Sequence, residues 1–288
     1  MPSQTAGAHP LDSRDDDDAL RAFRREVEKP VEQIDLGRAA LVMARYAQPN
    51  LDVAHYVEKL DVMAAQIPSV SCSGVALARQ LFDALGYAGN TKDYADPRNS
   101  YLNQVVDRKL GIPITLSVVY LEIARRLGLR ANGVGLPGHF IVRVEEADGS
   151  TIFLDPFNHG AEMDEVACRA RVRLVADMPF ESGFLDPVDS HYILTRMLNN
   201  LKNAHASSGD LLGATSVVER LLILNPGDGA ELRNLGMLYA QTGRRLCAIG
   251  LLQRYLGRLA QAGQAESDEA AQVRVFLSAL TKSVARWN

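Results

Sequence analysis

Three features are missing from this 288-residue sequence: long apolar runs, paired cysteines and an excess of positive charge. No segment approaches the roughly 20 apolar residues of a membrane-spanning helix, and the N-terminus lacks the apolar stretch of an export signal. Three cysteines without a C-x-x-C spacing argue against a disulfide framework or a structural zinc site. The net charge of -4, with lysines and arginines scattered along the chain, disfavours nucleic-acid binding. We therefore expect a cytoplasmic protein with no membrane or nucleic-acid partner.

The remaining composition suits a soluble globular protein. Hydrophobic residues make up 47% of the chain, which is enough for one large core or two ordinary ones. The histidines and acidic residues show no metal-binding spacing, so we expect neither a metal nor another cofactor. Residues 1–18 are polar and acidic, which predicts a disordered tail. From residue 19 to residue 111 apolar residues recur at helical spacing, which predicts a helical N-terminal part.

The pattern changes after Gly111. Pro113 suits the first position of a helix. Apolar residues at helical spacing follow it, and Gly128 is predicted to end the helix. A strand is predicted through residues 133–136, and another follows over residues 139–145. A turn at Asp148-Gly149 predicts a hairpin into a third strand over residues 151–155. A helix followed by antiparallel strands indicates the α+β class.

The C-terminal third shows an internal repeat with an offset of 34 residues. Small or apolar residues coincide at four pairs of positions: Leu198 with Leu232, Leu201 with Leu235, Ala214 with Ala248, and Val218 with Leu252. Gly236 and Tyr239 occupy the small and aromatic positions of a tetratricopeptide repeat, whereas the first repeat has Lys202 and His205 there. A further amphipathic helix over residues 268–285 is predicted to cap the array, because about three units are needed to bury a continuous core.

Four motifs follow one another in the middle of the chain: Gly111-Ile-Pro-Ile-Thr-Leu-Ser117, Arg126-Leu-Gly-Leu129, Gly135-Leu-Pro-Gly-His-Phe-Ile-Val-Arg143, and Phe153-Leu-Asp-Pro-Phe157 with Gly160. Together they resemble the SirB-type family of bacterial proteins, and the resemblance runs from about Asp35 to Leu259. The resemblance implies a transglutaminase-like (papain-like) helix-plus-sheet domain with a helical N-terminal cap, followed by all-α tetratricopeptide repeats. We place the first domain at residues 19–187 and the second at residues 188–288. The family resemblance does not itself supply a reaction.

The transglutaminase-like pattern also assigns roles to single residues. It places a nucleophilic cysteine at the start of the helix, about fifteen residues before the closing glycine, and that position here is Pro113. The resemblance carries over His139 and Asp155 as the histidine and acid of a triad, but no nucleophile. Proline has no attacking atom, and it lacks the N–H that might stabilise an oxyanion. The inherited acyl-transfer chemistry is therefore not expected as such.

Three other residues are weak candidates for the nucleophile. Thr115 and Ser117 lie on the helix just after Pro113, although a serine or threonine there more often bonds to a backbone carbonyl one turn earlier. Cys72 precedes a predicted helix, whose positive end would stabilise a thiolate. Cys168 and Cys247 lie among apolar neighbours and are expected in the core.

The register of the predicted hairpin decides whether His139 meets Asp155. A two-residue turn pairs residues whose numbers sum to 297, which puts Asp155 on the opposite face from His139. A three-residue loop at residues 147–149 makes the sum 296, which places Asp155 opposite Ile141 and diagonal to His139 on one face. If His139 and Asp155 form the pair that the family resemblance implies, the hairpin must have the longer loop. The alternative is a histidine that only stabilises the corner at Pro137.

Two functions of different classes follow. The first is a non-catalytic interaction or regulatory module, in which repeats bind an unknown protein or peptide through polar residues of the first repeat helix. The candidate binding residues are Asn199, Asn200, Lys202 and Asn203, although a solvated helix face would look the same. The second function is a hydrolase or acyl-transferase that uses Ser117, Thr115 or Cys72 with the His139 and Asp155 pair.

Overall fold

The computed structural model describes residues 13–68 and 73–285, so Cys72 lies outside the described residues. Contacts divide the chain into two compact units, Met1–Asn200 and Leu201–Asn288. The division falls inside helix α8 (Ser190–Ser208), thirteen residues later than the boundary expected after residue 187. In the part of the chain that the structure describes, no helix combines the length and hydropathy that crossing a membrane requires.

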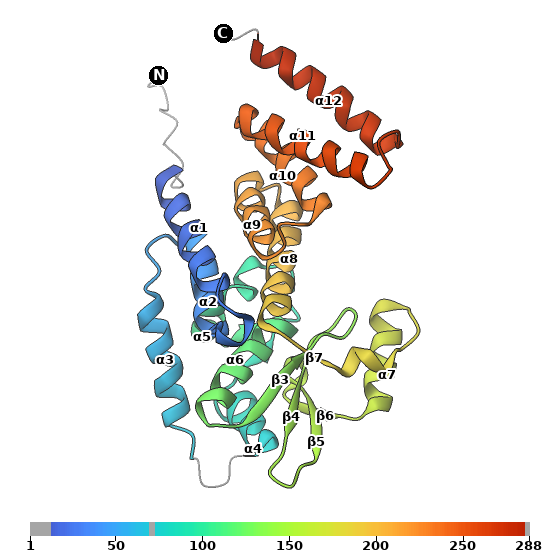
Figure 1. The fold of residues 1–288 in the computed structure, drawn as a ribbon. Coiled ribbons are helices and arrows are strands. Elements are labelled where there is room, and N and C mark those ends of the chain that lie inside the picture. Colours follow the sequence, from blue (N-terminus) through green and yellow to red (C-terminus); the bar gives the residue numbers. More distant parts are fainter. Residues whose placement is uncertain (1–12, 69–72, 286–288) are drawn as a thin grey trace. The chain divides into compact units, whose positions relative to one another are not determined.

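The first unit begins with helices (Figure 1). Helix α1 spans Ser13–Val27, which corrects the predicted disordered tail, because residues 13–18 are helical; residues 1–12 lie outside the described part. Asp35 and Asp52 start the next two α-helices by accepting hydrogen bonds from backbone N–H groups of the first turn. The helical segments that follow α1 are η1 (Val31–Gln33), α2 (Leu36–Met43), η2 (Ala44–Tyr46), α3 (Val53–Ala65), α4 (Gly74–Ala78), η4 (Arg79–Ala84), η5 (Pro97–Asn99) and α5 (Leu102–Arg108).

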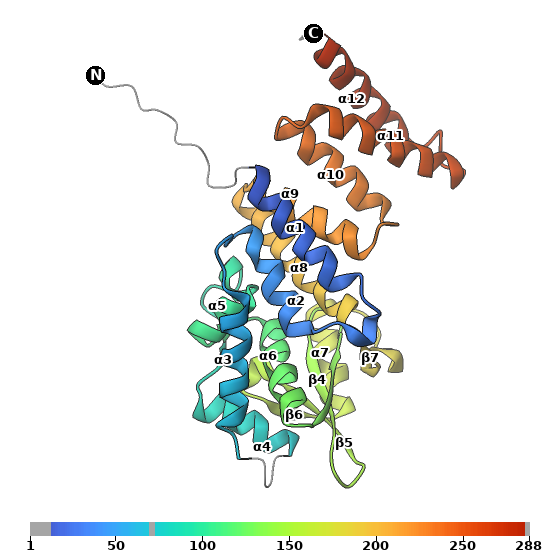
Figure 2. The same ribbon diagram turned by 60° about the vertical axis from the view of Figure 1, so that its left-hand side comes forward.

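Helix α6 (Pro113–Arg126) is the central element of this unit. It begins at Pro113, as predicted, and ends before Gly128, whose φ of 74° suits a glycine after a helix. Every residue from Pro113 to Ala124 is buried. The helix contacts α2, α3, α4 and α5 as well as two strands of the sheet, so it lies between the N-terminal helices and the sheet (Figure 2).

The sheet has five antiparallel strands in the order β6-β5-β4-β3-β7. Their bounds are β3 (Arg130–Val134), β4 (Ile141–Glu145), β5 (Thr151–Asp155), β6 (Ala161–Met163) and β7 (Pro187–Val188). Strand β3 begins three residues before the predicted strand, because pairing with β4 extends back to Arg130. A separate two-stranded parallel sheet joins β1 (Ala88–Gly89) to β2 (Leu110–Gly111).

The hairpin between β4 and β5 has the longer loop. Val142 pairs with Leu154 and Glu145 with Thr151, so paired residue numbers sum to 296. The Glu146 N–H then donates to the Ser150 carbonyl, which leaves residues 147–149 as the loop. Asp155 and His139 are therefore on the same face, as the family reading predicts.

Helix α7 (Glu165–Ala176) covers that face of the sheet, since Cys168 and Val172 pack against Val134 and Ile141. Val144 points to the other face, where it contacts Gly74 of α4. The short 3₁₀ segments η6 (Pro156–Asn158) and η7 (Ser182–Leu185) follow β5 and α7 respectively.

The second unit is entirely helical in its described part. It holds the end of α8, then α9 (Leu211–Leu224), α10 (Gly229–Gln241), α11 (Arg245–Gln261) and α12 (Asp268–Ala285). The last helix has the bounds predicted for the cap, and all eight residues of the repeat alignment are buried. A Cβ on Gly236 would lie 2.7 Å from the Leu252 side chain, so the small residue allows α10 and α11 to pack closely. Cys247 is exposed, which corrects its predicted place in the core.

Candidate functional site

His139 and Asp155 are in contact. The His139 Nε2 lies 2.8 Å from Asp155 Oδ2, and the residues are 5% and 1% exposed respectively. His139 precedes β4, where its N–H donates to the Leu136 carbonyl, and Asp155 ends β5. The hairpin register brings together two residues that are 16 positions apart in the chain. Such burial leaves little of the pair accessible to a substrate.

The Asp155 carboxylate is surrounded by donors. Asn158 Nδ2 donates to Oδ2 over 2.6 Å, the backbone N–H groups of Phe157 and Asn158 donate to Oδ1, and Arg171 Nη2 lies 3.6 Å from Oδ2. Burial by itself raises the pKa of Asp155, but the hydrogen bonds and positive charges of its neighbours outweigh burial and lower that pKa below 3.8. The carboxylate is therefore ionised at neutral pH, and it also starts η6 as its N-cap.

A row of two aromatic rings, Phe157 and Tyr94, packs next to the His139 ring. The Phe157 ring lies edge-on to it with centroids 6.4 Å apart, and Tyr94 packs edge-on against Phe157 at 6.0 Å. A Cβ on Gly89 would lie 2.6 Å from Phe157, so this glycine makes room for the row. Among the described residues, the only side chain that hydrogen-bonds the His139 ring is Asp155.

The hydroxyls of α6 are engaged elsewhere. Ser117 Oγ donates to the Pro113 carbonyl over 2.8 Å, which is the bond to the preceding turn that serines in helices commonly make. Thr115 Oγ1 donates to the Asn99 carbonyl over 2.7 Å and accepts from the Ile112 N–H. Both side chains have no exposed surface. Neither hydroxyl makes a hydrogen bond to the His139 ring in the described chain.

The two described cysteines differ in their exposure to solvent, since Cys168 is buried and Cys247 is exposed. Cys168 is fully buried in the core beneath the sheet, and burial raises the pKa of its thiol to about 11, with a further contribution from nearby carboxylates. That thiol is therefore protonated at neutral pH and is a poor nucleophile. Cys72 lies outside the described residues.

A pocket of about 360 Å³ opens beside Asp155 rather than beside His139. Asn158 and Arg171 provide its other polar groups, and the remaining lining residues are Ala161, Met163, Ala167, Ala170 and Leu174. Because the carboxylate is already satisfied, the guanidinium of Arg171 is the charged group that this pocket presents to solvent.

Two residues of this site were not predicted. Asn158 lies three residues after Asp155, in a segment that begins Asp-Pro. Such a segment is typical of a turn in which the aspartate bonds to backbone N–H groups two or three residues later, so a local signal existed. Arg171 reaches Asp155 from α7, and no local pattern indicates such a long-range approach.

The candidate binding residues all lie on α8. Lys202 forms an ion pair with Glu231 of α10, so its ammonium is not free for a ligand. Asn199, Asn200 and Asn203 are partly or fully exposed, and no hydrogen bond of their side chains is found within the described chain.

Comparison with known proteins agrees with this architecture. Residues 53–199 match the Transglutaminase-like superfamily, and residues 201–278 match a tetratricopeptide repeat. A UPF0162 protein of Xylella fastidiosa (strain Temecula1) is 40% identical over 237 residues, which cover 78% of this chain and 84% of that protein. Protein SirB1 of Salmonella typhimurium is 32% identical over 145 residues, which cover 49% of this chain and 53% of that protein.

Among solved structures, menin, whose crystal structure shows its binding site for the Mixed Lineage Leukemia protein, matches with a TM-score of 0.42 and 10% identity. The match covers 86% of this chain and 70% of menin. The sequence relatives and the two family matches agree with the motifs and with the order of the two units. The chain therefore belongs to the SirB-type family, together with the UPF0162 proteins, in which a transglutaminase-like domain is followed by tetratricopeptide repeats.

Proposed function

We propose that this protein is a non-catalytic, cytoplasmic interaction module. In this proposal the transglutaminase-like unit keeps His139 and Asp155 as part of its framework, and the repeats bind a protein or peptide. The main support for this proposal comes from helix α6. Its first residue is Pro113, and its hydroxyls at Thr115 and Ser117 donate to backbone carbonyls. A nucleophile must give its proton to a base within about 3 Å, whereas both hydroxyls donate to backbone carbonyls.

The His139 and Asp155 pair has a structural reason to persist without catalysis. Both residues are buried, and the Asp155 carboxylate also organises η6 through Phe157 and Asn158. Loss of one partner would leave a buried charge or donor unsatisfied, which costs about 1–3 kcal/mol or more. Stability alone can therefore retain the pair.

Labelling with reactive probes tests the absence of catalysis. A serine-reactive fluorophosphonate is expected to leave the wild-type protein unlabelled, and iodoacetamide is expected to label it to the same extent as His139→Ala. His139-dependent labelling of any serine, threonine or cysteine would refute the proposal. The variant Cys72→Ala isolates the alternative hydrolase or acyl-transferase, since Cys72 is the candidate nucleophile that the described residues do not include.

Affinity capture tests the binding role of the repeats. The intact chain is compared with a variant in which Asn199, Asn200 and Asn203 are changed to alanine; the control changes the exposed Gln253 and Gln272 to alanine. We expect a partner that is retained by the wild type and the control but lost from the asparagine variant. Equal capture by all three proteins would argue against a binding role for this face of α8.

A further inference from the structure

The edge of β3 is only partly covered. Strand β7 pairs with Gly133 and Val134, after which the chain turns at Asp189, whose carboxylate accepts the Tyr192 N–H at the start of α8. Residues 130–132 thus have β4 on one side and no described strand on the other. Within the described chain, no hydrogen bond other than those to β4 reaches their backbone groups. A strand edge of this kind is able to pair with another extended segment.

A pocket of about 750 Å³ lies along this open edge, and it shares no residue with the pocket beside Asp155. Its lining includes residues 130–133 from β3, and the N-terminal segment contributes Val31 of η1, Ile34 just after η1, and Leu36 of α2. Leu121, Leu129 and Ile193 add apolar surface. The site therefore combines unpaired backbone with an apolar recess, which are the two elements needed to bind a peptide as an added strand.

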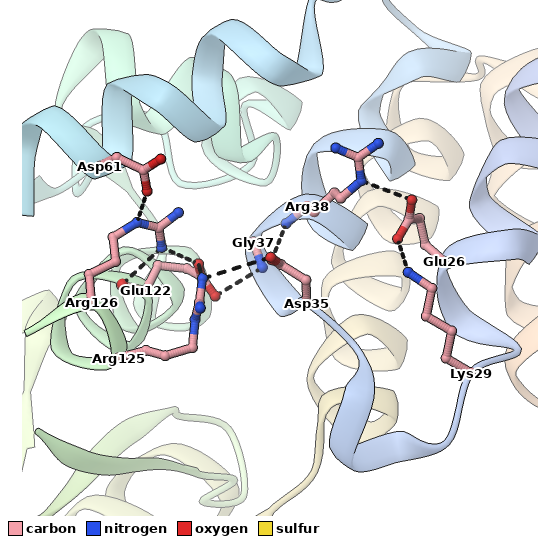
Figure 3. A network of polar contacts seen from close by, with 9 residues as sticks. All are labelled: Glu26, Lys29, Asp35, Gly37, Arg38, Asp61, Glu122, Arg125 and Arg126. Carbon is pink, nitrogen blue, oxygen red and sulfur yellow. Dashed lines mark hydrogen bonds and ion pairs between the residues drawn. The ribbon is translucent and has the colours of Figure 1, made fainter. Parts of the chain in front are cut away.

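The cationic groups that line the pocket already form ion pairs. Glu122 accepts from the Gly37 N–H over 3.0 Å, from Arg125 over 3.0 Å and from Arg126 over 2.5 Å (Figure 3), and it is 2% exposed. Arg130 is paired with Glu145 at 3.3 Å. Both lining arginines, Arg125 and Arg130, thus have carboxylate partners.

The acidic groups exceed the basic ones. Four acidic residues line the pocket, namely Glu32, Glu122, Glu145 and Asp189, against the two arginines. Glu32 is exposed and has no hydrogen bond or ion pair with another described residue. The surplus charge at this site is negative, so a complementary ligand is cationic.

We propose that an extended, basic peptide segment binds here by adding a strand to the open edge of β3. Its backbone pairs with residues 130–132, an apolar side chain enters the recess beside Leu121 and Ile193, and a lysine or arginine side chain meets Glu32. Three unpaired residues offer about 10 Å of edge, which is enough for a short linear motif.

Selection from a random-peptide phage library against the intact chain tests the proposal. We expect the selected peptides to alternate apolar residues with lysine or arginine. Synthetic copies are then titrated by fluorescence anisotropy, and Glu32→Lys should weaken their binding about fivefold or more, since an attractive charge becomes repulsive. Because only alternate residues of a strand direct their N–H groups to one edge, N-methylation should abolish binding at every second peptide position.

The control is Glu162→Lys, which makes the same charge change at an exposed position of β6. It should leave the affinity unchanged, and circular dichroism should show both variants folded. The proposal is overturned if the library yields no peptide sensitive to Glu32→Lys, if Glu162→Lys weakens binding equally, or if the effect of N-methylation does not alternate.

Discussion

At the scale of single residues, the candidate site is defined by how its polar groups are satisfied. Asp155 accepts from His139, Asn158 and two backbone N–H groups, so one carboxylate holds the end of β5, the ring and the start of η6 together. Ser117 and Thr115 each donate to a backbone carbonyl. Polar residues that look catalytic in the sequence therefore have structural partners.

The first prediction concerns Asp155. Because its pKa is lowered in the folded protein, its stabilising contribution is present above the unfolded pKa of about 3.8 and is lost as the pH falls through the folded pKa. We expect Asp155→Asn to lower the free energy of unfolding at pH 7 by about 2–3 kcal/mol. The loss of stability on acidification below about pH 4 should be smaller in the variant than in the wild type.

Urea unfolding followed by circular dichroism at a series of pH values measures both effects. Glu162→Gln, an exposed carboxylate in the same sheet, is the matched control and should behave like the wild type. Identical acid dependence of the wild type and Asp155→Asn would contradict the ionised, hydrogen-bonded state of Asp155.

The second prediction concerns the thiols. Cys247 is exposed, whereas burial raises the pKa of Cys168 to about 11. We expect a maleimide at pH 7.5 to modify Cys247 quickly in the native protein and to modify Cys168 only after unfolding. Peptide mapping by mass spectrometry distinguishes the two sites. Rapid modification of Cys168 in the native protein would show that the packing of α7 on the sheet does not protect this thiol.

At the scale of elements, two helical glycines distinguish the contribution of close helix packing to stability from that of helix propensity. A Cβ on Gly236 would lie 2.7 Å from Leu252, whereas nothing lies within 4 Å of a Cβ on Gly250 in α11. Alanine favours a helix over glycine by a similar amount at both positions. The difference between the two alanine variants therefore reports the close approach of α10 and α11.

The third prediction is that Gly236→Ala is less stable than Gly250→Ala by about 1–3 kcal/mol, which is the usual penalty of overpacking a core. We also expect Gly250→Ala to be as stable as the wild type or slightly more stable. Thermal and urea unfolding of the three proteins measure these differences. Equal stability of the two variants would mean that Leu252 moves aside without strain.

The elements also show where local patterns were sufficient. The bounds of α12 and the start of α6 follow directly from apolar periodicity and from Pro113. The start of β3 at Arg130 does not, because it depends on pairing with β4. Likewise, no local pattern indicated that Cys247 would be exposed on its helix.

At the scale of the whole molecule, the chain consists of two compact units, each of which holds a cluster of buried hydrophobic residues. In the first, α6 and α7 pack on opposite faces of the sheet, and in the second, Leu232, Leu252 and Val273 belong to one helical core. Units with their own cores open largely independently.

The fourth prediction follows from this independence. Gly236→Ala should accelerate amide hydrogen exchange in α10 and α11 but not in β4 or β5, and Asp155→Asn should have the opposite pattern. Hydrogen exchange followed by mass spectrometry measures both variants against the wild type. Acceleration across both units by either substitution would contradict their independent opening.

The sequence by itself determined the helical segments, the repeat and the hairpin strand ending at Asp155, because each depends on a pattern of residues along the chain. Only the tertiary structure decided the hairpin register, the partners of Ser117 and Lys202, the approach of Arg171 and the open edge of β3. These features depend on which distant segments pack together and on which polar groups remain satisfied after packing. Local periodicity carries no information about either.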